Sequence, residues 1–236
     1  MARPSSDSPP PPITTAVRSA TVRTRQKNGS TGGVSLKPKP DFSRESALLE
    51  AGAEWIAGVD EVGRGPLAGP VLAAAVVFEN AETIPDGIND SKKLTAKARD
   101  RLFEEILATA HVAIASVSAR EIDVINIRQA TLKAMTQALG QLAIQPAHAL
   151  FDGRDVPPSW AARGTAIIKG DAVSVSIAAA SIVAKVQRDR MMQHADRVYP
   201  GYGFASNVGY GSATHLTAIT ELGPTPIHRM SFRPLR

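Results

Sequence analysis

Four acidic residues stand where apolar segments of the chain end. Asp60 and Glu61 follow the apolar run 55–59, Asp152 follows a second run and Asp171 follows a third. In an α/β sheet, reactive groups gather at such strand ends. Because clustered carboxylates repel one another, they need a cation, and oxygen ligands favour Mg²⁺ or Mn²⁺. The pattern predicts a divalent-metal site, and a pair of ions there could serve phosphodiester hydrolysis.

Simpler interpretations remain open for two of the four acids. Asp152 precedes Gly153, which is the usual composition of a turn, and Asp171 alone fits a helix cap. Asp60 and Glu61 are harder to explain in this way, because adjacent buried acids cost stability without a partner. Sequence spacing does not establish that the three apolar segments are neighbours in one sheet.

A glycine-rich loop, Gly63-Arg64-Gly65, follows the first two acids directly. It resembles a dinucleotide fingerprint only in part, because it leads into a strand and not into a helix. Glycine allows backbone amides and carbonyls to approach a ligand closely. Such groups could recognise a ribose 2′-hydroxyl, which donates and accepts hydrogen bonds. A tight turn without a ligand is the alternative.

Several further residues could contact nucleic acid. Ser91, Lys92 and Lys93 form a polar loop suited to phosphate contacts, and Lys185 lies on a predicted helix from which it could reach the same site. Tyr210 belongs to a glycine-rich aromatic stretch and could stack on a sugar or base. Solvated lysines and packed aromatic rings are the alternatives.

Hydrophobic periodicity places these residues on an alternating α/β chain. We predict strands over 55–60, 71–78, 111–117, 147–151 and 165–169. We predict helices that follow Thr95, follow the capping box Ser118–Glu121 as far as Leu142, span 173–198, and span 213–222 between Ser212 and Gly223. The helix over 173–198 begins with an apolar stretch and should be buried. His215 and His228 lack metal-ligand spacing, so we expect them to be structural.

Composition limits the class of protein. The chain has 236 residues, of which 43% are hydrophobic and 21% charged, as in globular domains. It has no cysteine, which excludes disulfides, zinc thiolate sites and a thiol nucleophile and suits a reducing cytoplasm. No apolar run approaches the roughly 18 residues of a spanning helix, so we expect no membrane association.

The net charge of +5 is concentrated at the N-terminus. Residues 1–40 carry seven basic residues against Asp7, which leaves the rest of the chain close to neutral. Proline, serine and glycine dominate this part, so we predict a disordered basic tail over 1–44 and a folded domain over 45–236. The tail could be a passive extension, a polyanion tether or a targeting peptide.

The acids and the loop belong to a longer pattern. The segment Gly58-Val59-Asp60-Glu61-Val62-Gly63-Arg64-Gly65-Pro66-Leu67-Ala68-Gly69-Pro70 resembles the signature of the ribonuclease HII family, and the agreement continues in order over about 55–233. It includes Asp90-Ser91-Lys92-Lys93-Leu94, Asp152-Gly153, Lys169-Gly170-Asp171, Ser176 to Val186, Gly209-Tyr210-Gly211 and His228-Arg229-Met230-Ser231-Phe232. The basic tail lies outside the resemblance.

The resemblance implies a ribonuclease-H-like α/β fold, with a mixed five-stranded sheet flanked by helices and a helical C-terminal extension. It implies an enzyme that cleaves the RNA of RNA–DNA hybrids and cuts on the 5′ side of single ribonucleotides in DNA. We expect the protein to act as a monomer. The metal-binding acids map to Asp60, Glu61, Asp152 and Asp171. The loop that reads the 2′-hydroxyl maps to 63–65, and the tyrosine that stacks on the following deoxyribose maps to Tyr210.

Two positions depart from the family pattern. Val208 stands where the family often has lysine, and Ser212 stands where threonine is common. The first change removes a cation near Tyr210, and the second keeps a hydroxyl at a predicted helix cap. A junction resolvase on the same fold and a non-catalytic hybrid-binding module are the alternative functions; the former would not need the glycine loop, and the latter would gain nothing from the acids.

Overall fold

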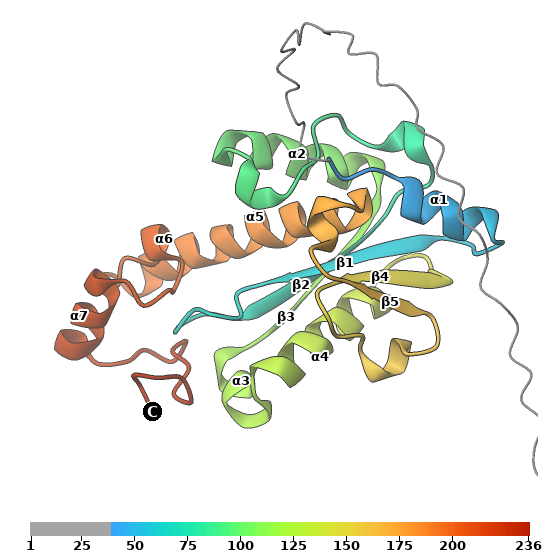
Figure 1. Ribbon diagram of the computed structural model, residues 1–236. Helices are drawn as coiled ribbons and strands as arrows, with labels where there is room; N and C mark the ends of the chain where they lie inside the picture. The colour runs from blue at the N-terminus through green and yellow to red at the C-terminus, as the bar shows by residue number, and fades with distance from the viewer. Residues whose placement is uncertain (1–38) are drawn as a thin grey trace, which may run out of the picture. The chain divides into compact units, whose positions relative to one another are not determined.

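The computed structural model describes residues 39–236. Their strands form one five-stranded mixed sheet (Figure 1). The strands are β1 Ile56–Val62, β2 Val71–Val77, β3 His111–Val117, β4 His148–Asp152 and β5 Gly164–Ile167. Their order is β3-β2-β1-β4-β5. The first three strands pair antiparallel, whereas β1, β4 and β5 run parallel to one another. The five predicted strands and the mixed sheet are confirmed.

Helices cover both faces of the sheet (Figure 1). The helices of at least seven residues are α1 Ser43–Glu50, α2 Ala96–Thr109, α3 Ala119–Ile125, α4 Ile127–Gly140, α5 Val175–Val198 and α7 Ala213–Leu222. Successive β2 side chains point to opposite faces. Leu72 and Val76 pack with α2 and α5, whereas Ala73 and Ala75 pack with α4. Strand β2 is therefore buried on both sides.

Helix α5 lies directly on β1. A Cβ atom added to Gly58 would stand 2.1 Å from the carbonyl carbon of Ser176, so only glycine permits this approach. Ser174 caps the helix by accepting a hydrogen bond from the Ile177 amide, and the buried Glu45 carboxylate accepts one from the Ser176 amide. The prediction that this segment is a buried central helix is confirmed.

The helix predicted from Ser118 to Leu142 is wrong as a single element. It divides into α3 and α4 at Asn126, whose φ of 66° interrupts the helical backbone. The Asn126 side chain then caps α4 by accepting a hydrogen bond from the Gln129 amide. The capping box is half formed, because Glu121 pairs with Lys133 instead of returning to Ser118. A local polar side chain thus outweighs the continuous apolar periodicity.

The C-terminal extension follows α5 through the short helix α6, Phe204–Asn207, and α7 (Figure 1). Ser212 caps α7 by accepting from the His215 amide, and Gly223 ends it at a φ of 77°, as predicted. Within the described part of the chain, no helix has the length and apolarity needed to cross a membrane.

The predicted tail lies mostly outside the described residues, which begin at Lys39. The folded domain already includes the last residues of that predicted tail. The Val175 amide donates to the Asp41 carbonyl at 2.9 Å, and α1 begins at Ser43. The start expected at residue 45 therefore falls inside α1.

Candidate active site

The parallel pairing of β1 with β4 brings two of the predicted acids together. Val59 lies opposite Phe151, so the next residues along the two strands, Asp60 and Asp152, emerge side by side. Register partners on parallel strands point to the same face, which here is the face covered by α5. Asp60 is only 5% exposed. Sequence spacing alone could not establish that Asp60 and Asp152 are neighbours; the strand register shows that they are.

Asp171 joins this pair through the turn that follows β5. Lys169 adopts a left-handed conformation, with φ of 57°, and starts the short helix Gly170–Ala172. The Gly170 amide donates to the Asp152 carboxylate at 2.6 Å, which fixes this turn against the end of β4. Asp171 is buried, and the Lys92 ammonium lies 3.5 Å from its carboxylate.

Glu61 approaches from the opposite face of β1. Its carboxylate lies 3.4 Å from the Arg64 guanidinium. It lines a small cavity of about 30 Å³ together with Asp152 and Arg154, beneath α4. Asp152 influences the pKa of both Asp60 and Glu61, and Asp171 influences that of Asp152, so the four predicted acids lie near one another at the edge formed by the carboxyl ends of β1 and β4.

The electrostatics of this edge favour a cation. Burial, together with Glu61 and Asp152, raises the pKa of Asp60 well above its usual value. Burial and Asp171 raise the pKa of Asp152, and burial raises that of Glu61 despite Arg64. Burial lowers the pKa of the Lys92 ammonium, but the nearby carboxylates, chiefly that of Asp171, raise it by more. The pKa of Lys92 is therefore raised overall.

Oxygen donors that repel one another at a buried strand end fit a hard divalent cation. Among residues 39–236, however, no three His, Cys, Asp or Glu side chains already form a closed ligand cage. Two of the acids face cationic side chains instead: Glu61 faces Arg64, and Asp171 faces Lys92. Binding of an ion would therefore require these two carboxylates to turn from their present partners.

The predicted phosphate-binding residues differ in their surroundings. Lys92 has an 81% exposed side chain, and Lys93 lies 3.8 Å from the Asp90 carboxylate. Lys185 forms an ion pair with Asp189, 2.7 Å away along α5. Ser91 is turned inward, where its hydroxyl lies 3.0 Å from that of Ser181, a neighbour of Asp60. Of the three lysines, Lys92 lies beside the acids, whereas the Ser91 hydroxyl reaches Asp60 only through Ser181.

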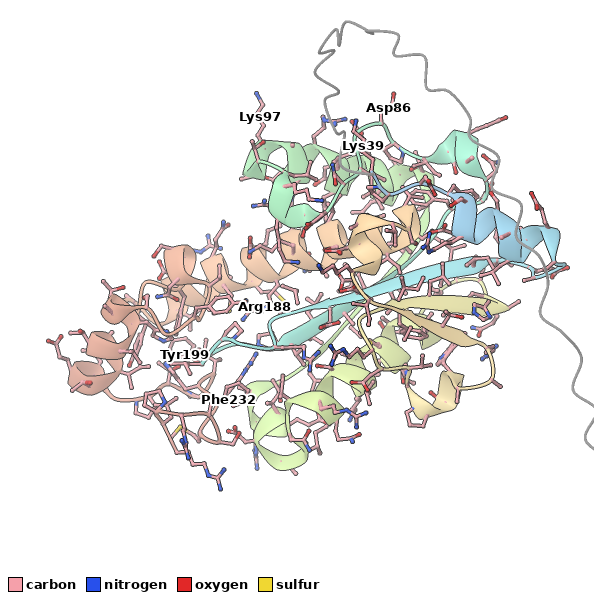
Figure 2. All side chains as sticks on the ribbon, in the orientation of Figure 1. Lys39, Asp86, Lys97, Arg188, Tyr199 and Phe232 are labelled. Atoms are coloured by element: carbon pink, nitrogen blue, oxygen red, sulfur yellow. The ribbon has the colours of Figure 1, made fainter. Side chains whose placement is uncertain are left out.

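Arg188 of α5 holds the glycine loop between β1 and β2. The sequence predicted the helix but not this role of Arg188. Gly63 has a φ of +93°, and a Cβ atom there would meet the Arg188 side chain at 2.3 Å. The guanidinium donates to the carbonyls of Pro70, Val208 and Ala68 at 3.0, 2.9 and 3.2 Å. In Figure 2, Arg188 lies between α5 and the sheet.

A second arginine, Arg229, holds the same loop from the C-terminal segment. It donates to the Gly63 and Arg64 carbonyls at 2.6 and 3.0 Å, and twice to that of Gly69. Its guanidinium also lies over the ring of Phe232, which is labelled in Figure 2. Burial, followed by the charge of Arg188, lowers the pKa of Arg229 to about 9. The loop carbonyls are therefore engaged from inside the protein.

Tyr210 completes the surface beside the loop. Its side chain is half exposed, and a Cβ atom on Gly65 would stand 3.3 Å from the tyrosine ring. The Leu67 amide donates to the Gly209 carbonyl at 2.7 Å, which fixes the two segments together. The structure thus brings the glycine loop, Tyr210 and the acids to one region.

Comparison with known proteins agrees with this arrangement. A family model described as Ribonuclease HII matches residues 57–234. Ribonuclease HII of Rhizobium leguminosarum bv. trifolii (strain WSM2304) is 58% identical over 197 residues, which cover 84% of this chain and 86% of the relative. Ribonuclease HII of Sinorhizobium medicae (strain WSM419) is 57% identical over 199 residues, which cover 84% and 92%.

Solved structures share the fold. The ribonuclease H2 from Pyrococcus horikoshii OT3 matches with a TM-score of 0.67 and 30% identity, over 78% of this chain and 96% of that chain. A chain of the PCNA:RNase HII complex from Archaeoglobus fulgidus matches with a TM-score of 0.65 and 26% identity, over 76% and 96%.

The sheet order, the flanking helices and the match to solved structures define a nuclease of the ribonuclease-H-like class. More specifically, the chain belongs to the ribonuclease HII family. It is an endoribonuclease that cleaves the RNA strand of RNA–DNA hybrids, and its family depends on divalent metal ions. The binding-module alternative is thereby set aside.

Proposed function

We propose that this enzyme also cuts on the 5′ side of single ribonucleotides embedded in duplex DNA, with Asp60, Glu61, Asp152 and Asp171 as its metal-binding and catalytic residues. The observation that carries the proposal is the parallel register that sets Asp60 beside Asp152, with the Gly170 amide holding the Asp171 turn against them. Mg²⁺ or Mn²⁺ is the proposed cofactor, because every donor is a carboxylate oxygen.

The acids would hold two ions, which when bound supply Lewis-acid activation of a water and stabilisation of the departing 3′-oxygen. Asp152 is central to this arrangement, because it lies near both Asp60 and Glu61. Lys92 neutralises Asp171 in the absence of an ion and stands where a phosphate would enter. Lys93 and Lys185 extend this basic approach along the duplex backbone.

The glycine loop would read the ribonucleotide. The carbonyls of Gly63 and Arg64 are engaged by Arg229, which holds the loop backbone in one conformation. Gly65 leaves space beside Tyr210, so a sugar ring could lie against the tyrosine and expose its 2′-hydroxyl to the loop. A resolvase acting on all-DNA junctions would have no use for this arrangement.

The test uses three labelled duplexes of one sequence: an RNA–DNA hybrid, a DNA duplex with one ribonucleotide, and an all-DNA duplex. Each is incubated with Mg²⁺, with Mn²⁺ or with chelator. We expect the first two to be cut only with metal, and the third to stay intact. Asp60→Asn and Asp152→Asn should abolish cutting. Equal cutting by these variants, or cutting of the all-DNA duplex, would contradict the proposal.

Variants of Tyr210 test substrate recognition separately from the cleavage chemistry. Tyr210→Ala should weaken cutting at the single ribonucleotide more than cutting of the hybrid, by about 5- to 140-fold if stacking contributes about 1–3 kcal/mol. Tyr210→Phe keeps the ring and should preserve the preference. An equal loss on both substrates would refute the role of Tyr210. We further propose that the enzyme is monomeric and cytoplasmic; the lack of cysteine suits a reducing compartment.

A further inference from the structure

Two buried histidines lie behind Tyr210. His215 on α7 is fully buried and His228 is 2% exposed, and their Nε2 atoms are 3.0 Å apart. They pack against Tyr202 and Phe204, with ring centroids between 5.2 and 6.4 Å apart. Their surroundings are aromatic, so the imidazole nitrogens must satisfy one another and nearby backbone groups.

The direction of each hydrogen bond in this pair is determined. The Thr225 amide donates to His228 Nδ1 at 2.8 Å, so that nitrogen carries no proton. The proton of His228 must then sit on Nε2, which donates to His215 Nε2. His215 accepts through Nε2, so its own proton sits on Nδ1, which donates to the Tyr210 carbonyl at 2.8 Å.

The chain of hydrogen bonds therefore runs from Thr225 through His228 and His215 to Tyr210. Both imidazoles are neutral, because a second proton on His228 would oppose the Thr225 amide. Burial and the neighbouring His215 lower the pKa of His228 to about 4, in agreement with this state. The residue after His228 is Arg229, which holds the Gly63 and Arg64 carbonyls. One C-terminal segment thus holds both sides of the proposed ribose-reading surface.

We propose that His215 and His228 are positioning residues that fix the backbone of Tyr210 relative to the glycine loop, and that this fixed geometry sets the preference for a single ribonucleotide over continuous RNA. The inference rests on the proposed function of Tyr210. Its physical basis is that a neutral histidine pair with one allowed proton arrangement donates to the Tyr210 carbonyl through His215 Nδ1, beside the Ser212 amide, which donates to the same carbonyl at 2.8 Å.

The tautomers of the two histidines can be determined by NMR, independently of any activity assay. Long-range ¹H–¹⁵N spectra of the full chain, with ¹⁵N-labelled histidine, should show His215 protonated at Nδ1 and His228 protonated at Nε2. The His228 signals should stay unchanged from pH 8 to pH 5. Two Nε2-protonated rings, or titration of His228 near pH 6.5, would overturn the hydrogen-bond chain.

A matched pair of variants tests the effect on specificity. His215→Asn keeps a donor near the Nδ1 position and should preserve the contact to the Tyr210 carbonyl. His215→Gln keeps an acceptor near the Nε2 position, for His228, and loses the contact to Tyr210. We expect His215→Gln to lower the ratio of single-ribonucleotide to hybrid cleavage about five- to tenfold, and His215→Asn to leave it within about twofold. His194→Gln is the control.

The outcomes separate the two proposals. Equal ratios in both His215 variants, whether lowered or unchanged, would refute positioning by His215 and leave the role of Tyr210 intact. If wild type shows no single-ribonucleotide cleavage, the proposed function fails, and with it the specificity role. The spectra would then still decide whether the hydrogen-bond chain exists. Thermal unfolding of each variant confirms that the compared proteins are folded.

Discussion

Arg188 and Arg229 enclose the loop between β1 and β2 from two sides, although their like charges oppose each other. Within residues 39–236 neither forms an ion pair with a carboxylate, and every hydrogen bond that the two guanidinium groups make goes to a backbone carbonyl. Two buried cations are expensive unless all their donors are used. Both arginines therefore stabilise the backbone of this loop and of the segment before Tyr210.

Arg229→Lys should destabilise the protein and disturb the loop. Lysine keeps the charge but cannot reach several carbonyls with a planar fork, so hydrogen bonds to Gly63, Arg64 and Gly69 are lost. We expect a loss of about 2–4 kcal/mol in the free energy of unfolding, measured by urea denaturation. Arg120→Lys, at an exposed position of α3, should change it by less than about 0.5 kcal/mol. Equal values for the two variants would contradict the prediction.

Asp60→Asn should stabilise the metal-free protein while abolishing activity. The folded pKa of Asp60 lies above its unfolded value, so ionisation at neutral pH destabilises the folded state. Removing that charge should therefore raise the free energy of unfolding of the metal-free protein. Mn²⁺ should raise the melting temperature of the wild type but not of this variant. Asp86→Asn, on the exposed surface (Figure 2), should behave as wild type. A variant less stable than wild type in chelator would count against buried repulsion.

Strand β1 and helix α7 were predictable because their signals are local. The apolar run before Asp60 and the Ser212 cap of α7 each fit within a few residues, and the structure confirms both elements. The division at Asn126 was not predictable, because the apolar spacing continues across it. The side chain of that asparagine satisfies the first amides of α4, which competes with a continuous helix.

The supports of the candidate site could not be predicted for a different reason. Arg188 lies in the charged second half of α5, where the pattern indicates a solvated residue, yet it is 1% exposed. Its partners are carbonyls more than a hundred residues away in sequence, or in the segment before Tyr210. Every residue has a backbone carbonyl, so the sequence does not indicate which carbonyls accept these hydrogen bonds. Sequence reasoning therefore found the residues proposed to contact substrate and missed those that hold them.

His228 should make the stability of the protein depend on pH. Its folded pKa of about 4 lies below the ordinary value of 6.5, so between these values the unfolded chain takes up a proton that the folded chain does not. The free energy of unfolding should fall as pH drops through this window, by at most about 1.4 kcal/mol per pH unit from this group. Urea titrations from pH 7 to pH 4.5 would measure it. His228→Gln should have a shallower slope than wild type and His194→Gln the same slope; unchanged slopes in both would refute the assignment.

Val208 adopts a left-handed conformation, with φ of 44°, which is strained for a β-branched residue. Arg188 holds it there through a hydrogen bond to the Val208 carbonyl at 2.9 Å. Val208→Asn should relieve the strain and stabilise the protein by about 0.5–1 kcal/mol, as measured by urea unfolding. Val208→Lys adds a cation at this position, so binding of a hybrid should become more salt-dependent, with a slope that is larger by about one phosphate contact. Binding by the asparagine variant, which adds no charge, should keep the wild-type salt slope. A lysine variant with that same slope would show that residue 208 does not reach the duplex backbone.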